Sequence, residues 1–225
     1  MTLLKRAFII HWRGWRQFVR DMAVIQFGFL LFGLAIVMMV KADLGTSPWV
    51  ALEVALTRRL PLTLGQAAIL VAAVIILLDI TLREPLGWGS LANMVSIGLW
   101  VDWLTPLVPA PPLLWWLQAP YLLVGVLIMG FATAVYVGVK AGAGPRDSLM
   151  LAAARLFKVS VRTARTLVEI IVVSVGWLLG GSIGIGTLLF ALCIGPAVQL
   201  AFRLLRVRPL QTAPPAAPLA AAPEA

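Results

Sequence analysis

Six long apolar runs constrain this chain more than any other feature of its sequence. They cover residues 23–40, 66–82, 88–104, 121–139, 163–179 and 185–204. At a rise of about 1.5 Å per residue, a helix over each run can cross a hydrocarbon core of about 30 Å, with tilt or flanking residues making up any shortfall. The sequence therefore predicts an all-α polytopic membrane protein with six transmembrane helices.

The composition agrees with this prediction. Hydrophobic residues make up 61% of the 225 residues and charged residues 12%, whereas soluble domains carry about 25% charged residues. Cys193 and His11 are the only cysteine and histidine, so we expect no disulfide, no metal site and no cofactor. No motif of a hydrolase, metalloprotease or nucleotide-binding enzyme occurs, and we expect no enzymatic activity.

The net charge of +9 indicates how the chain is oriented. Basic residues of bacterial membrane proteins gather on cytoplasmic loops near anionic lipid. An even number of spans puts both termini on one side, and both ends carry basic clusters. We therefore expect an inner-membrane protein with both termini in the cytoplasm and the lipid bilayer as its surroundings, without nucleic-acid binding. A second copy of the chain or another membrane protein stays open as a partner.

Two further apolar segments, 48–57 and 145–157, are too short to span the bilayer as helices. Each begins at a Gly/Pro break, which favours short re-entrant or interfacial helices. The alternative is that both segments do span, which gives eight helices and parallel repeats. The count of basic residues on each side satisfies both topologies, whereas segment length favours six spans.

The flanks divide the chain into three parts. Residues 1–20 mix basic and aromatic side chains, which predicts a cytoplasmic amphipathic segment. Residues 21–207 form the membrane domain. Residues 208–225 are rich in proline and alanine, and we expect this tail to be disordered.

The membrane domain is internally duplicated. Val40-Lys41-Ala42 recurs as Val139-Lys140-Ala141 at an offset of 99, and the pattern G-x-G-[ST]-L at residues 87–91 recurs at 184–188 at an offset of 97. Repeat one covers about 23–105 and repeat two about 119–205. Because each repeat holds three spans, the second enters the membrane from the opposite side, so the sequence predicts two inverted repeats, each with one short broken helix. Such repeats point to a transporter-like site at the paired chain breaks.

The two chain breaks supply the candidate site. Arg146 opens the second short helix, where free backbone N–H groups and a positive charge could hold an anion. The alternative is that Asp147 caps this helix and pairs with Arg146 as a structural staple. The candidate substrate-binding residues are Gly45, Thr46, Ser47, Gly144, Arg146, Asp147 and Ser148.

A charge pair lies inside the fifth apolar run. Arg165 and Glu169 are four residues apart and so share one helix face. Charges at membrane depth usually face the protein interior, where they form either a packing lock or a path for protons or ions. Their counterparts 97 positions earlier are Ala68 and Ala72, so the duplication itself did not require the charges.

Three segments carry a resemblance to a known family. Residues 41–49 (KADLGTSPW), 142–150 (GAGPRDSLM) and 180–188 (GGSIGIGTL) resemble the signatures of YczE/YitT-type bacterial integral membrane proteins. The resemblance extends from about residue 16 to 203. The resemblance implies the fold and an inner-membrane location. It does not indicate a biochemical activity.

Together these features predict a transporter-like permease for a small solute, which could be an anion. The competing hypothesis is a non-transporting accessory or scaffold protein that supports another membrane-associated system. A cavity at the two chain breaks would favour the permease.

Overall fold

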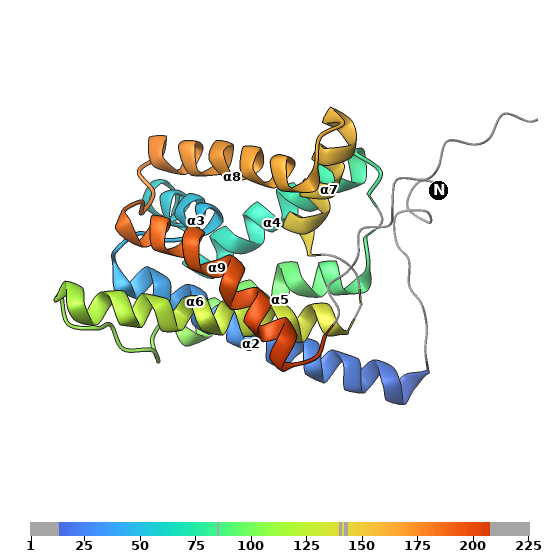
Figure 1. Ribbon diagram of the computed structural model, residues 1–225, viewed down its shortest axis with the longest axis horizontal. Coiled ribbons are helices and arrows are strands. Elements are labelled where there is room, and N and C mark those ends of the chain that lie inside the picture. The colour runs from blue at the N-terminus through green and yellow to red at the C-terminus, as the bar shows by residue number, and fades with distance from the viewer. Residues whose placement is uncertain (1–13, 85, 140, 142–143, 208–225) are drawn as a thin grey trace, which may run out of the picture.

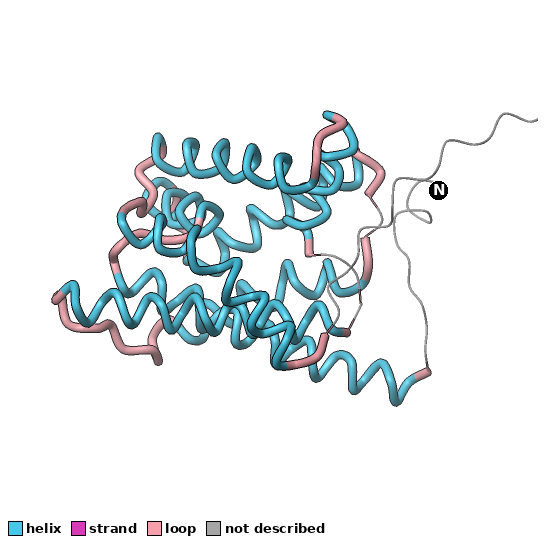
Figure 2. Tube along the Cα trace, in the orientation of Figure 1, coloured by secondary structure: helices cyan, strands magenta, loops and turns pink. Residues whose placement is uncertain are grey.

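The computed structural model describes residues 14–84, 86–139, 141 and 144–207 (Figure 1). Within these residues the chain is helical throughout, with turns and loops as connections and no strand (Figure 2). The helices are α2 (Trp15–Ala42), α3 (Pro48–Arg59), α4 (Leu64–Thr81), α5 (Trp88–Leu104), α6 (Trp115–Gly138), α7 (Pro145–Phe157), α8 (Val161–Leu178) and α9 (Ile185–Leu204).

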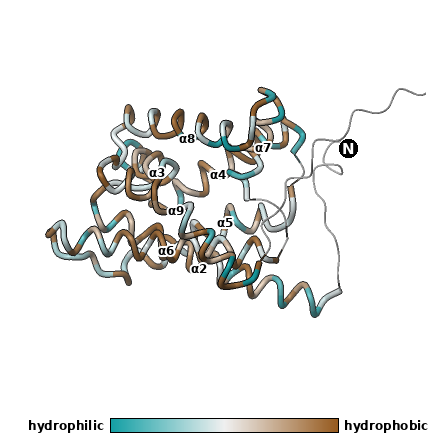
Figure 3. Tube along the Cα trace, in the orientation of Figure 1, coloured by the Kyte–Doolittle hydropathy of each residue, from teal (hydrophilic) through white to brown (hydrophobic). Residues whose placement is uncertain are grey.

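Four of the described helices, α2, α4, α6 and α9, are long and apolar enough to cross a membrane. Apolar residues run along these helices (Figure 3), and many of the large apolar side chains are exposed. Helix α5 has 17 residues, and α8 carries Arg162, Arg165 and Glu169, so neither belongs to this set. The all-α membrane architecture is thus confirmed, while length and composition support four spans where the sequence predicted six.

Helix α2 begins at Trp15, which is earlier than the apolar run at 23–40 predicted. Its first turns place Phe18 against Trp88 of α5, with ring centres 5.3 Å apart. The described part of the expected amphipathic segment is therefore continuous with α2, and the expected boundary after residue 20 falls inside a helix. Residues 1–13 and the expected tail at 208–225 lie outside the described residues.

The described helices other than α3 and α7 alternate in direction along the chain. Helices α2 and α6 pack antiparallel, because Gly28 lies against Tyr136 and Gly125 lies against Ala35. Helix α5 runs parallel to α2, with Gln26 bonded to Ser96 (2.8 Å). In the same way α9 runs parallel to α6. Helices α2, α5 and α8 therefore run one way and α4, α6 and α9 the other, with α2 and α6 starting at opposite ends (Figure 1).

The two short helices have 12 and 13 residues, which corresponds to about 18–20 Å at 1.5 Å per residue. Helix α3 lies at the end where the α8–α9 turn lies, because Arg58 donates to the carbonyl of Gly180. Helix α7 lies toward the other end, where Arg155 donates to the carbonyl of Leu82 at 2.8 Å (Figure 1). The short helices therefore approach the centre of the molecule from opposite ends.

The start of each short helix follows from its local sequence. Proline occupies the first helical position in both, Pro48 and Pro145, where its missing N–H costs no hydrogen bond. Ser47 caps α3 by accepting from the N–H of Val50. The two prolines are 97 positions apart, and the two halves are compared at this offset from here onward.

Helices α4 and α5, in the first half of the chain, pack closely against each other. We call the α4–α5 contact the first seam: a Cβ on Gly98 would lie 2.5 Å from the carbonyl oxygen of Gly65, so the two backbones touch. Asp102 fastens the same seam by accepting from Thr63 Oγ1 (2.6 Å) and from the N–H of Gly65 (2.8 Å). Backbone contact of this kind requires glycine on both helices.

The equivalent α8–α9 pair, the second seam, is not closed. The residues 97 positions after Gly65, Gly98 and Asp102 are Arg162, Gly195 and Gln199. A Cβ on Gly195 would have nothing within 4 Å. Helix α8 packs on α3 and α7, and α9 packs on α6, whereas α8 and α9 scarcely contact each other.

Candidate functional site

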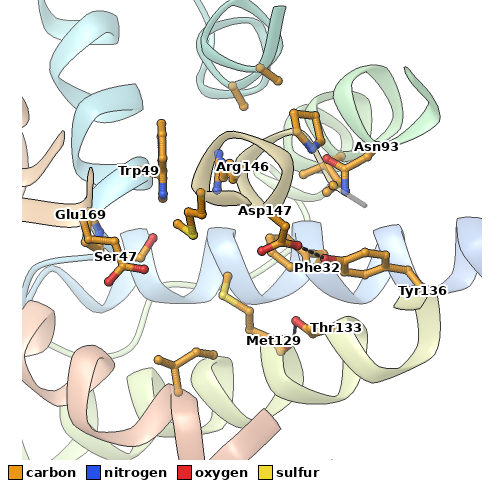
Figure 4. Close-up of a pocket in the computed structure, with 18 of the residues that line it drawn as sticks. Phe32, Ser47, Trp49, Asn93, Met129, Thr133, Tyr136, Arg146, Asp147 and Glu169 are labelled. Carbon is orange, nitrogen blue, oxygen red and sulfur yellow. Dashed lines mark hydrogen bonds between the residues drawn. The ribbon is translucent and has the colours of Figure 1, made fainter. Parts of the chain in front are cut away.

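A cavity of about 160 Å³ lies where the starts of α3 and α7 meet (Figure 4). Since one bound water occupies roughly 10–15 Å³ on this kind of measure, the cavity has room for several waters or a small solute. Its lining includes pairs of residues, one from each half of the chain, that are 97 positions apart. These pairs are Ser47 with Gly144, Pro48 with Pro145, Trp49 with Arg146, Ala68 with Arg165, Ala72 with Glu169, Asn93 with Phe190, and Ile97 with Ile194.

Arg146 is held by two contacts from α3. Its guanidinium forms an ion pair with Glu53, whose side chain is fully buried. The guanidinium carbon lies 5.3 Å from the ring centre of Trp49, which is a cation–π arrangement. The expected Arg146–Asp147 staple is therefore replaced by a link between the two short helices, and the charge of Arg146 is matched by Glu53.

Asp147 lies in the first turn of α7 and lines the cavity beside Tyr136 (Figure 4). Its carboxylate accepts a hydrogen bond from the Tyr136 hydroxyl at 3.1 Å. Among the described residues, no cation forms an ion pair with Asp147. A negative charge at this position is favoured by the positive end of the α7 dipole.

Trp49 brings an unsatisfied donor to the cavity. The residue is 7% exposed, and its indole Nε1 has no hydrogen-bond partner in the described structure. Figure 4 shows the nitrogen end of the ring directed toward the cavity interior. Because a buried donor without a partner costs free energy, this group is suited to a bound acceptor.

Arg165 and Glu169 meet on α8 at 2.9 Å, and both line the cavity. Their side chains are 53% and 30% exposed, because the second seam is open beside them. In the first half the equivalent wall is formed by Ala68 and Ala72. The cavity therefore has one charged wall and one small, apolar wall.

The candidate residues fall into two groups. Ser47, Gly144, Arg146 and Asp147 line the cavity, whereas Gly45, Thr46 and Ser148 do not. The latter three have structural positions. Gly45 (φ 102°) lies on the start of α9, Thr46 donates its N–H to the carbonyl of Ser182 at 3.1 Å, and Ser148 is buried in α7.

Sequence reasoning missed three important residues, Trp49, Tyr136 and Glu53. Trp49 could have been found, because it occupies the position equivalent to Arg146 once the offset is set at 97. Glu53 could not be linked to Arg146 from the repeat, because the two residues are 93 positions apart instead of 97. Nothing in the spacing of Tyr136 predicts its bond to Asp147.

These features define a multi-pass, all-helical membrane protein with a central cavity. Its family follows from comparison with known proteins: the chain belongs to the family of unknown function DUF6198, which matches residues 19–203. The resemblance to YczE-type proteins is thereby confirmed.

Two relatives match this chain over most of their own length. An uncharacterised protein of Haemophilus influenzae is 33% identical over 185 residues, which are 82% of this chain and 84% of that protein. The uncharacterised membrane protein YczE of Bacillus subtilis is 36% identical over 169 residues, which are 74% of this chain and 77% of YczE. No solved structure matches the chain.

Proposed function

We propose that this protein is a permease of the bacterial inner membrane that moves a small solute through the cavity by alternating access, rather than an enzyme. The observation that carries the proposal is that the cavity is lined by equivalent residues from both halves, at the starts of two short helices. Paired broken helices that meet near the membrane centre are the usual substrate site of transporters built from inverted repeats.

The topology that goes with this function has six spans, namely α2, α4, α5, α6, α8 and α9, with α3 and α7 as re-entrant helices. Support comes from the alternating directions of the six helices and from the lengths of the two short ones. Arg20, Arg83 and Arg203 lie at the proposed cytoplasmic end, and Lys41 and Arg58 lie at the opposite end. An excess of basic residues at one end fits cytoplasmic termini.

The difference between the two seams supports a transport cycle. The first seam is closed near Asp102, at the proposed outer end, and the second is open near Gln199, at the proposed inner end. When two inverted repeats adopt different conformations, the cavity between them is open to one side of the membrane only. Exchange of the two conformations would open the cavity to the other side.

The ion pair of Arg146 changes the expected solute. An anion was the first candidate because Arg146 begins a helix, but its charge is already matched by buried Glu53. We therefore propose that the transported solute is small and that it need not be an anion.

A plug in the cavity tests the function. Thr133 on α6 lines the cavity, while Leu127 on the same helix is 44% exposed and provides a matched control. The intracellular small molecules of a deletion strain are compared by mass spectrometry after complementation with wild type, Thr133→Trp or Leu127→Trp. We expect wild type and Leu127→Trp to restore the wild-type solute levels and Thr133→Trp to fail, at equal amounts of protein in the membrane.

An accessory or scaffold protein would give a different result. Its role does not use the cavity, so Thr133→Trp would complement as well as Leu127→Trp. That outcome, or the absence of any solute whose level follows the gene, would contradict the permease.

A further inference from the structure

We propose that the solute is a small organic cation, recognised by the Asp147 carboxylate and the aromatic rings around it, and that it carries a hydrogen-bond acceptor for Trp49. This inference rests on the proposed function, since it names the class of solute for the same cavity.

Within the part of the chain that the structure describes, the charges at the cavity leave one carboxylate unmatched. Arg146 is paired with Glu53, and Arg165 is paired with Glu169. Asp147 accepts only the neutral hydroxyl of Tyr136 among the described residues. Counted with Glu53, which pairs with Arg146 from outside the cavity lining, the charged side chains of the described site carry one excess negative charge. A cationic ligand would complete the site without a new unpaired charge at membrane depth.

The surroundings of Asp147 suit an organic cation. Tyr136, which bonds to Asp147, packs edge-on against Phe32 with ring centres 6.4 Å apart, and both line the cavity (Figure 4). Aromatic faces attract alkylammonium groups. Met129 and Met150 add adaptable apolar surface around the same space.

The same lining argues against a bare metal cation. Hard cations such as Na⁺, Mg²⁺ or Ca²⁺ require several oxygen ligands. In the described residues no group of three or more His, Cys, Asp or Glu side chains is arranged to hold a metal ion. Asp147 shares the cavity with the rings of Phe32 and Tyr136 and with Met129 and Met150, a lining that suits an ammonium group.

Trp49 adds a second requirement. Its Nε1–H is buried, unpartnered and directed into the cavity. Because one ring face of Trp49 already carries Arg146, the open group is the N–H donor. A hydroxyl or carbonyl oxygen on the ligand would satisfy it, so an amino alcohol or a similar ammonium compound fits better than a simple alkylammonium ion.

Direct binding to the purified full-length protein in detergent tests this class independently of transport. Titration calorimetry compares choline, ethanolamine and tetramethylammonium with 3,3-dimethyl-1-butanol, the uncharged carbon isostere of choline, and with inorganic phosphate. We expect choline or ethanolamine to bind roughly 10- to 100-fold more tightly than the isostere, as a charge-assisted contact predicts, and phosphate not to bind.

Variants at Asp147 then test whether this carboxylate recognises the cation. Asp147→Asn should remove the preference for the cation over its isostere, while Asp147→Glu should keep a preference. Asp43→Asn, a carboxylate at the exposed end of α2 outside the cavity, is the matched control and should bind as wild type does. The wild-type comparison of cation and isostere stands even if Asp147→Asn does not fold.

The results separate this inference from the proposed function. No cation binding above the isostere, a preference that survives Asp147→Asn in folded protein, or phosphate binding would overturn the cation assignment. Cation binding by a protein that changes no solute level in cells would contradict transport and leave the assignment standing. A permease whose solute is neutral or anionic would contradict this inference alone.

Discussion

At the residue scale, the contact that holds the two short helices together is the ion pair between Glu53 and Arg146. Glu53 is fully buried on α3, and Arg146 is the second residue of α7. A buried charge that loses its partner destabilises a protein far more than an exposed one does. The Arg165–Glu169 pair is more exposed and is expected to contribute less.

The two pairs give a direct comparison of stability. Glu53→Ala should lower the free energy of unfolding by up to about 3–5 kcal/mol, because it leaves the guanidinium of Arg146, which is only 24% exposed, without its ion partner. Glu169→Ala should cost under about 1 kcal/mol. Chemical denaturation of both variants in the same detergent measures the difference.

Removal of both buried charges provides the control for that comparison. Glu53→Leu together with Arg146→Met should recover part of the loss, because two apolar side chains need no ion partner. Equal costs for Glu53→Ala and Glu169→Ala would show that the Glu53–Arg146 pair does not form in the membrane.

Sequence reasoning found the charged residues of the site and paired only some of them correctly. Arg165 and Glu169 follow from helix periodicity, since a spacing of four puts both on one face. The partner of Arg146 could not be predicted, because Glu53 comes from another helix and meets it only through the packing of α3 on α7. Asp147, the adjacent residue, was the wrong choice because its side chain reaches Tyr136.

At the element scale, the two seams differ by a few side chains at equivalent positions. Gly65, Gly98 and Asp102 close the first seam, whereas Arg162 replaces the first glycine in the second. The larger arginine side chain favours a looser contact than the glycine of the first seam does. The second seam is therefore free to open while the first is closed.

An alanine at each equivalent glycine should test this difference. Gly98→Ala places a Cβ 2.5 Å from the carbonyl oxygen of Gly65, so we expect a strong loss of thermal stability and of folded protein. Gly195→Ala meets open space and should be neutral or stabilising by up to about 1 kcal/mol, the helix propensity of alanine over glycine.

Thermal unfolding of the two variants in detergent measures that contrast. Equal tolerance of both substitutions would mean that the backbones of α4 and α5 do not touch. Equal damage from both would mean that the second seam is closed in the protein.

The helices themselves were largely predictable, because apolar runs, capping residues and Gly/Pro breaks are local signals. Thr63 and Gln66, for example, form a capping box at the start of α4 and carry its local Thr-x-x-Gln pattern. The start of α2 at Trp15 was not predicted, because its polar first turns hide the helix from a search for apolar runs. The open second seam leaves no local signal either, since it depends on how α8 and α9 pack on other helices.

At the scale of the whole molecule, the proposed topology predicts which loops face the cytoplasm. Pro109 lies at the same end as Lys41, since Lys41 donates to the carbonyl of Val108, and Val207 lies at the other end, beside Gly138. Reporter fusions at Pro109 and Ala225 should therefore report opposite sides, with Ala225 cytoplasmic. Both reporters on one side would exclude six spans.

We propose that the two seams close alternately around one cavity, and disulfide cross-linking tests this alternation most directly. In a Cys193→Ala background, Thr63→Cys with Asp102→Cys probes the first seam, where the native oxygen atoms lie 2.6 Å apart. Ser160→Cys with Gln199→Cys probes the equivalent positions of the second seam. We predict that each pair cross-links in membranes when the other is reduced, and that a disulfide at one seam prevents the other. Simultaneous cross-linking of both pairs in one molecule, or a second seam that never cross-links in active protein, would contradict alternating closure.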